Sequence, residues 1–104
     1  MTLETVAKVS DTPPGTISVH EVGGVRIALC NVNGRFYAID DVCTHDGGPL
    51  DQGELDGEQV ECPRHGAKFD VTSGRATVLP AVRPVKTYRV EVDGDDVKVE
   101  MGSS

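Results

Sequence analysis

The stretch from residue 43 to residue 70 reads CTHDGGPLDQGELDGEQVECPRHGAKFD, and it decides how this sequence is interpreted. It holds two short loops, Cys43-Thr-His45 and Cys62-Pro-Arg-His65, with 16 residues between His45 and Cys62. Two of the three cysteines and two of the three histidines in the 104-residue chain fall in these loops. Thiolates and imidazoles are common ligands of iron and zinc. The two loops therefore predict a metal site.

The order of the side chains narrows the kind of metal site. Zinc fingers and ribbons usually pair like ligands within a loop, whereas each loop here offers one cysteine and one histidine. This order suits a two-metal cluster in which one metal takes both thiolates and the other takes both imidazoles. The Rieske [2Fe–2S] centre has that arrangement. A mononuclear zinc site with two Cys and two His ligands is the alternative.

Outward from these loops, apolar and polar residues alternate in short runs that turn signals separate, a pattern typical of β-strands. Sixteen valines, against five leucines and three isoleucines, favour a pleated sheet. The dipeptide Asn33-Gly34 is a strong hairpin signal. The chain is therefore expected to be all-β, with a loop-rich insert at about residues 40–84. Strands are predicted at residues 5–9, 17–22, 25–32, 36–39, 59–62, 68–70, 87–93 and 96–100.

Charge and composition exclude several classes of function. The formal net charge of −7 would repel phosphate backbones, so nucleic-acid binding is not expected. No apolar run approaches the ~20 residues of a membrane helix, and the N-terminus lacks the pattern of a secretory signal. We therefore expect a cytoplasmic protein that does not insert into a membrane. An odd number of cysteines in a reducing compartment also argues against a disulfide framework.

The two loops resemble the cluster-binding loops of a Rieske domain. The resemblance extends to two segments that follow them, Ala67-Lys-Phe-Asp70 and Ser73-Gly74-Arg. The small ferredoxins of bacterial ring-hydroxylating dioxygenases are the most similar members. The resemblance implies a single domain over residues 1–104, an antiparallel β-sandwich with a loop-rich cluster-binding subdomain at about residues 40–84. It also implies one [2Fe–2S] cluster, with Cys43 and Cys62 on the buried iron and His45 and His65 on the outer iron.

The residues around the cluster follow from the same resemblance. Respiratory Rieske proteins carry a further cysteine in each loop, and the matching positions here are Gly48 and Arg64, so no disulfide joins the loops. High-potential centres carry a Ser and a Tyr hydroxyl where this chain has Ala67 and Phe69. Without these donors a potential near the low end of the Rieske range, about −150 mV, is expected. The residues expected around the cluster are Gly47, Gly48, Pro49, Pro63, Arg64, Gly66, Ala67, Phe69 and Pro80.

The function implied is that of an electron-transfer ferredoxin and not of an enzyme. It would carry one electron from an NAD(P)H-dependent flavin reductase to a terminal oxygenase of the ring-hydroxylating type. Docking is expected to be transient and to use the exposed edges of the two histidines, on a monomer. The alternative is an accessory subunit of a nitrite reductase or of an iron–sulfur assembly system, and a structural zinc module is a third possibility.

Three further features have simpler interpretations. Cys30 lies in a buried-strand pattern and is interpreted as a small core residue. His20 is interpreted as a surface residue. Asp40, Asp41 and Asp46 crowd the first loop, where they would either bias the choice of partner or form a solvated acidic loop.

Overall fold

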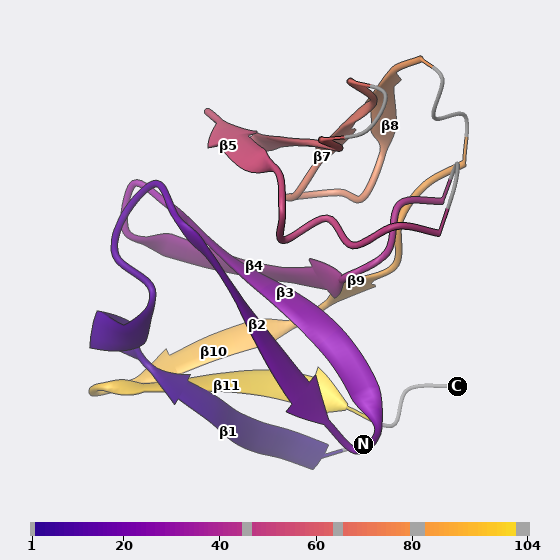
Figure 1. The fold of residues 1–104 in the computed structure, drawn as a ribbon. Coiled ribbons are helices and arrows are strands. Elements are labelled where there is room, and N and C mark those ends of the chain that lie inside the picture. Colours follow the sequence, from indigo (N-terminus) through magenta and orange to yellow (C-terminus); the bar gives the residue numbers. More distant parts are fainter. Residues whose placement is uncertain (1, 45–46, 64–65, 80–82, 102–104) are drawn as a thin grey trace.

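The computed structural model describes residues 2–44, 47–63, 66–79 and 83–101 (Figure 1). In these ranges the regular structure is β-strand apart from one 3₁₀ turn, η1 (Val9–Asp11). This confirms the all-β fold class. The strands are β1 (Thr2–Lys8), β2 (Ile17–Val22), β3 (Val25–Val32), β4 (Arg35–Asp40), β5 (Glu54–Asp56), β6 (Gln59–Glu61), β7 (Lys68–Asp70), β8 (Ala76–Val78), β9 (Thr87–Tyr88), β10 (Val90–Asp93) and β11 (Asp96–Met101).

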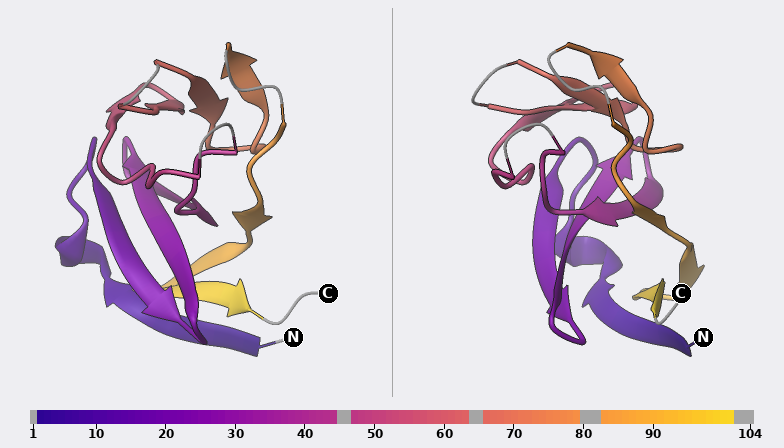
Figure 2. Two further views of the ribbon diagram at one scale, coloured as in Figure 1. Left: turned by 45° about the vertical axis from the view of Figure 1, so that its right-hand side comes forward. Right: turned by 90° about the vertical axis from the view of Figure 1, so that its right-hand side faces the viewer.

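The strands form three antiparallel sheets, with strand orders β1-β11-β10, β2-β3-β4-β9 and β5-β6-β7-β8. We call them the basal, middle and distal sheets. Figures 1 and 2 show the basal sheet below the middle sheet and the distal sheet above it. The chain enters the distal region after β4 and returns to the middle sheet at β9.

The middle sheet separates two apolar cores, and β3 explains why. The last six of its eight residues are buried, because successive side chains point to opposite faces and both faces are covered. Ile27 and Leu29 belong to the core shared with the basal sheet. Ala28 and Cys30 belong to the core shared with the distal sheet, beside Phe69.

The predicted Asn33-Gly34 turn joins β3 to β4. Both residues have positive φ, 53° and 92°, which a tight hairpin turn of this kind requires. The buried Asn31 supports the turn: its side-chain oxygen accepts the Gly34 N–H at 2.7 Å, and its amide donates to the Thr12 carbonyl at 2.7 Å.

The structure also departs from the sequence-based expectations. The insert at residues 40–84 contains the distal sheet, because β5 and β8 pair with the two strands expected there. The strand expected at residues 87–93 is divided into β9, in the middle sheet, and β10, in the basal sheet. His20 is half-buried in β2, with its Nε2 2.7 Å from the Ser18 hydroxyl, because β2 packs along β3 and does not project into solvent.

Candidate metal centre

Two loops with the same internal hydrogen bonds carry Cys43 and Cys62. We call residues 42–50 the first Cys loop and residues 62–67 the second Cys loop. In each loop the cysteine N–H donates to the carbonyl five residues ahead, at 2.7 Å in both. In each, the cysteine carbonyl accepts the N–H of a glycine four residues ahead, at 2.7 Å from Gly47 and 3.1 Å from Gly66. These glycines have φ values of 76° and 74°, a left-handed conformation that other residues rarely adopt.

Different elements hold the two loops. The second Cys loop is the connection of the β6–β7 hairpin, whose register pairs Val60 with Phe69 and Glu61 with Lys68. The first Cys loop follows β4 and ends at Leu50, whose side chain is fully buried in the distal core. The β6–β7 ladder therefore holds the second Cys loop, and the buried Leu50 side chain holds the end of the first.

Two close approaches of the backbone bring these elements together. Gly53, just after the first Cys loop, lies so near β6 that a Cβ there would stand 1.7 Å from the Glu61 carbonyl oxygen. A Cβ at Gly74 would stand 2.2 Å from the Val85 carbonyl oxygen. The first contact sets residues 50–53 against the residue that precedes Cys62. Sequence reasoning missed Gly53, because the close approach exists only when Glu54 of β5 pairs with Glu61 of β6.

A hydrogen bond joins the first Cys loop to the segment that precedes β9. The Thr44 hydroxyl donates to the Arg83 carbonyl at 2.8 Å. Val85 continues this connection, because its N–H donates to the Gly74 carbonyl at 2.8 Å and its side chain is buried in the distal core. Three segments distant in sequence therefore meet at this end of the molecule.

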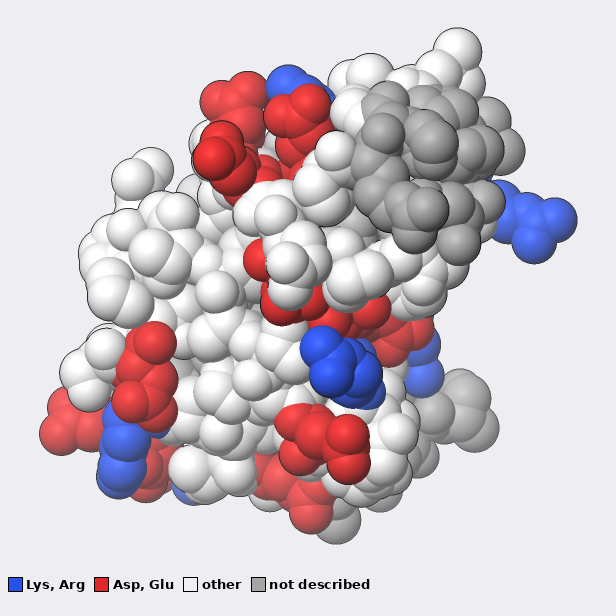
Figure 3. All heavy atoms as spheres, viewed as in Figure 1, with Lys and Arg blue, Asp and Glu red and all other residues white. Residues whose placement is uncertain are grey.

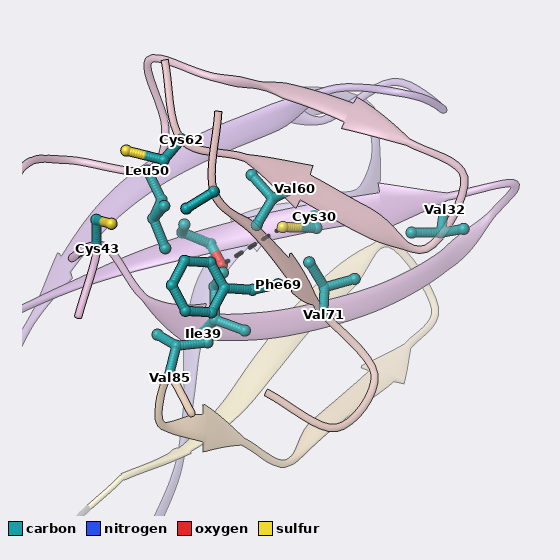
Figure 4. Close-up of a cluster of buried hydrophobic side chains, with 12 residues drawn as sticks. Cys30, Val32, Ile39, Cys43, Leu50, Val60, Cys62, Phe69, Val71 and Val85 are labelled. Atoms are coloured by element: carbon teal, nitrogen blue, oxygen red, sulfur yellow. Dashed lines mark hydrogen bonds between the residues drawn. The ribbon is translucent and has the colours of Figure 1, made fainter. Parts of the chain in front are cut away.

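The two loop cysteines are buried and form no disulfide. Cys43 and Cys62 are 0% and 1% exposed, and no disulfide joins any of the three cysteines, all of which lie in the described part of the chain. In Figure 4 the Cys43 and Cys62 side chains lie at one end of the distal core, beside Leu50. Cys30 lies farther inside, between Val60 and the middle sheet. The structure thus places both predicted ligands at the same end of the distal core and the third cysteine elsewhere in that core.

The interior position of Cys30 confirms its interpretation as a core residue. Burial, with a smaller contribution from the charge of Asp41, raises the pKa of the Cys30 thiol to about 12. A thiol with such a pKa stays protonated near neutral pH. It is therefore a poor metal ligand and a poor nucleophile.

A family model for the Rieske [2Fe-2S] domain matches residues 2–89. The chain belongs to this family. It is 41% identical over 101 residues to the ferredoxin component of biphenyl 2,3-dioxygenase from Rhodococcus jostii (strain RHA1), covering 97% of this chain and 94% of the relative. Among solved structures, the ferredoxin of carbazole 1,9a-dioxygenase from Nocardioides aromaticivorans IC177 superimposes with a TM-score of 0.90 at 36% identity, covering 95% of this chain and 97% of that one.

A second solved structure is a chain from the complex of reduced oxygenase and oxidized ferredoxin in carbazole 1,9a-dioxygenase. It matches with a TM-score of 0.87 at 39% identity, covering 93% of this chain and 91% of that one. Likeness extends along nearly the whole chain in each comparison. The Rieske resemblance found in the sequence and the expected architecture are both confirmed.

The described residues of this Rieske chain fit a [2Fe–2S] cluster of the family type. Two buried cysteines without a disulfide offer two thiolates, the ligands that one iron of a Rieske cluster takes. Of the other predicted ligands, His45 and His65 lie outside the described residues. Among the described residues, which include two of the four predicted ligands, no three Cys, His, Asp or Glu side chains group closely enough to hold a metal.

The remaining predicted residues divide by exposure. Gly47, Pro49 and Pro63 are exposed, Gly66 is half-buried, and Gly48, Ala67 and Phe69 are buried. Ala67 is part of the second Cys loop and Phe69 fills the centre of the distal core, so the two positions without hydroxyls are interior ones. Arg64 and Pro80 lie outside the described residues. The described part of this Rieske chain has no helix long and apolar enough to cross a membrane.

Proposed function

We propose that this Rieske chain is an electron-transfer ferredoxin that carries one electron from an NAD(P)H-dependent flavin reductase to a terminal oxygenase of the ring-hydroxylating type. The observation that supports it most is the pair of matching Cys loops, each with one buried cysteine outside any disulfide, in a chain whose relatives are ferredoxin components of dioxygenase systems. Such components are electron carriers and do not themselves catalyse the oxygenation.

We infer that Cys43 and Cys62 hold one iron and that His45 and His65 hold the other. The cluster, when bound, accepts and releases one electron. Two side chains on each iron would leave no coordination position open for a substrate. The buried Cys43 and Cys62 would keep their iron away from water, and the matching hydrogen bonds of the two Cys loops fix the backbone at both cysteines.

The docking surface for the partners is proposed to surround the two Cys loops. Gly47, Pro49 and Pro63 are exposed there, and Leu79, at 73% exposed, leads into the following segment. The predicted docking residues His45, Arg64, His65 and Pro80 belong to the same proposal. Figure 3 shows acidic side chains on both the upper and the lower part of one face. Together with a net charge of −7, this favours steering toward basic partners.

The reduction potential is proposed to lie near the low end of the Rieske range, about −150 mV. Hydrogen-bond donors to the cluster sulfurs stabilise the reduced, more negative state and raise the potential. Ala67 and Phe69, at the positions that carry hydroxyls in high-potential centres, have none to donate.

Film voltammetry of the purified protein from about pH 6 to pH 10 tests the proposal. We expect a single one-electron wave near the low end of the range that does not move with pH through neutrality. A wave above roughly +100 mV would contradict the argument from the missing hydroxyls. No wave, together with a colourless protein that holds zinc, would contradict electron transfer itself.

Size-exclusion chromatography from the native source separates the ferredoxin from the accessory-subunit alternative. A ferredoxin elutes as a coloured monomer and passes electrons between separately purified enzymes. A subunit of a nitrite reductase or of an assembly system elutes with its large partner.

A further inference from the structure

Asp41 is a buried, charged residue that immediately precedes the first Cys loop. It is not one of the proposed ligands. Its side chain is fully buried, whereas its ion-pair partner Arg26 is 57% exposed. One carboxylate oxygen, Oδ2, accepts from Arg26 Nη2 at 3.2 Å. The other, Oδ1, accepts the backbone N–H of Asp51 at 2.8 Å. A buried carboxylate persists only with such partners, so the fold holds this one in a defined place.

The two ends of the first Cys loop are joined by this side chain. Asp41 immediately precedes the loop and Asp51 immediately follows it. The Asp41 N–H also donates to the Arg26 carbonyl at 3.1 Å, which fixes the start of the loop to β3. Arg26 therefore holds both the backbone and the carboxylate of Asp41, and that carboxylate holds Asp51.

The second Cys loop is closed in another way. The backbone ladder of β6 and β7 pairs Glu61 with Lys68 directly beneath it. In the described part of the chain no strand ladder pairs residue 41 with residue 51. The two loops share the same internal hydrogen bonds but differ at the base. The Asp41 carboxylate closes the base of the first Cys loop, and the β6–β7 ladder closes the base of the second.

We propose that Asp41, held by Arg26, is a positioning residue for the metal centre: it closes the base of the first Cys loop and sets where Cys43 stands relative to Cys62. The inference rests on the proposed function, because it takes these two cysteines as cluster ligands. It replaces both sequence-based interpretations of Asp41, as a charge that biases the choice of partner and as part of a solvated acidic loop, because its side chain is buried. Residues that orient ligands affect metal retention strongly, and their loss typically costs about 10–100-fold in metal affinity.

Two variants and two matched controls test this role. Asp41→Ala removes both hydrogen bonds, and Asp41→Asn keeps an oxygen that accepts the Asp51 N–H but removes the charge that faces Arg26. Asp56→Asn is the first control, because it removes a carboxylate from an exposed ion pair, with Lys68, that does not involve Asp41. Tyr88→Phe is the second, because Tyr88 donates to Asp40, the neighbour of Asp41 in the chain.

Three readouts separate positioning from general stability: the electron paramagnetic resonance spectrum of the reduced cluster, the rate of cluster loss to a chelator, and exchange of the Asp51 amide in the metal-free chain. For Asp41→Ala we expect shifted g-values, cluster loss faster by about 10–100-fold, and amide exchange faster by about tenfold or more. Asp41→Asn should show smaller changes in the same direction. Both controls should keep the spectrum and the retention of the unmodified protein.

An unchanged spectrum and retention in both Asp41 variants would overturn the positioning role, and so would equal shifts in Tyr88→Phe or Asp56→Asn. If Asp41→Ala does not fold, Asp41→Asn and Arg26→Gln provide the comparison. Failure of the proposed function is distinguishable, because the unmodified chain would then assemble no Rieske cluster. The amide exchange in the metal-free chain would still report on the Asp41–Asp51 bond.

Discussion

The three cysteines of this chain differ in their surroundings. Cys43 and Cys62 lie on short loops with glycine-assisted backbone geometry at one end of the distal core. Cys30 lies on β3 in the middle sheet, where burial keeps its thiol protonated near neutral pH. We expect Cys43→Ser and Cys62→Ser to abolish the visible absorption of the cluster and Cys30→Ala to retain it. Reconstitution with iron and sulfide, followed by absorption spectroscopy, checks this, and a loss of colour in Cys30→Ala alone would contradict the assignment.

The raised pKa of Cys30 makes stability depend on alkaline pH. The thiol titrates near pH 8.5 in an unfolded chain and near 12 in the folded one, so between these values the folded chain holds a proton that the unfolded chain has released. The stabilisation is complete below the lower value and is lost as pH rises towards the upper one. From pH 8 to pH 10 the free energy of unfolding should fall by about 2 kcal/mol more in the unmodified chain than in Cys30→Ala. Urea titrations of both proteins measure this difference, in which the similarly raised pKa of Tyr88 cancels.

Ala67 offers a test of the missing hydroxyl. Ala67→Ser should raise the reduction potential by about 60 mV, because a hydroxyl that donates to a charged acceptor contributes about 1.5 kcal/mol and one electron is transferred. Voltammetry measures the shift. Ala7→Ser, buried in the other core, is the control and should leave the potential unchanged. A potential that does not move in Ala67→Ser would show that this position does not reach the cluster sulfurs.

At the scale of elements, the distal sheet depends on close crossings, because its strands have only three residues each. Gly74 and Gly94 both have positive φ, but only at Gly74 would a Cβ meet another segment, the Val85 carbonyl. Gly94→Ala should therefore cost about 1 kcal/mol of strain. Gly74→Ala should cost about 3 kcal/mol or more, because the crossing segment must also move. Urea unfolding compares the two variants. Equal losses in the free energy of unfolding would mean that the Val85 segment moves away from Gly74 at little cost.

At the scale of the whole molecule, both cores share the middle sheet. Adjacent residues of β3 and β4 point into opposite cores, as Ala38 and Ile39 do, so neither core can open without disturbing the strands that cover the other. We therefore propose that residues 1–104 form one domain and that the metal-free chain unfolds in one cooperative transition. Calorimetry should give equal calorimetric and van't Hoff enthalpies. Two separate transitions would instead make the region at about residues 40–84 an independent unit.

The sequence by itself determined the strands with strong alternation, the Asn33-Gly34 hairpin and the family. Those features depend on residues close together in the chain, whose pattern and spacing express the local backbone geometry directly. That Ala67 and Phe69 lie beside the cluster stays a prediction from the motif. The positions of His45 and His65 remain a prediction from the same motif.

Only the tertiary structure decided how the two Cys loops are held together. Gly53 meets Glu61, Gly74 meets Val85, and Thr44 bonds to Arg83, all contacts between segments that the sequence separates. Asp41 illustrates the reason: next to Asp40 in the sequence it indicates a solvated acidic loop, yet Arg26 and Asp51 enclose its carboxylate. The burial of a charge depends on which distant groups surround it. Local pattern does not contain that information, because packing of the three sheets creates those surroundings.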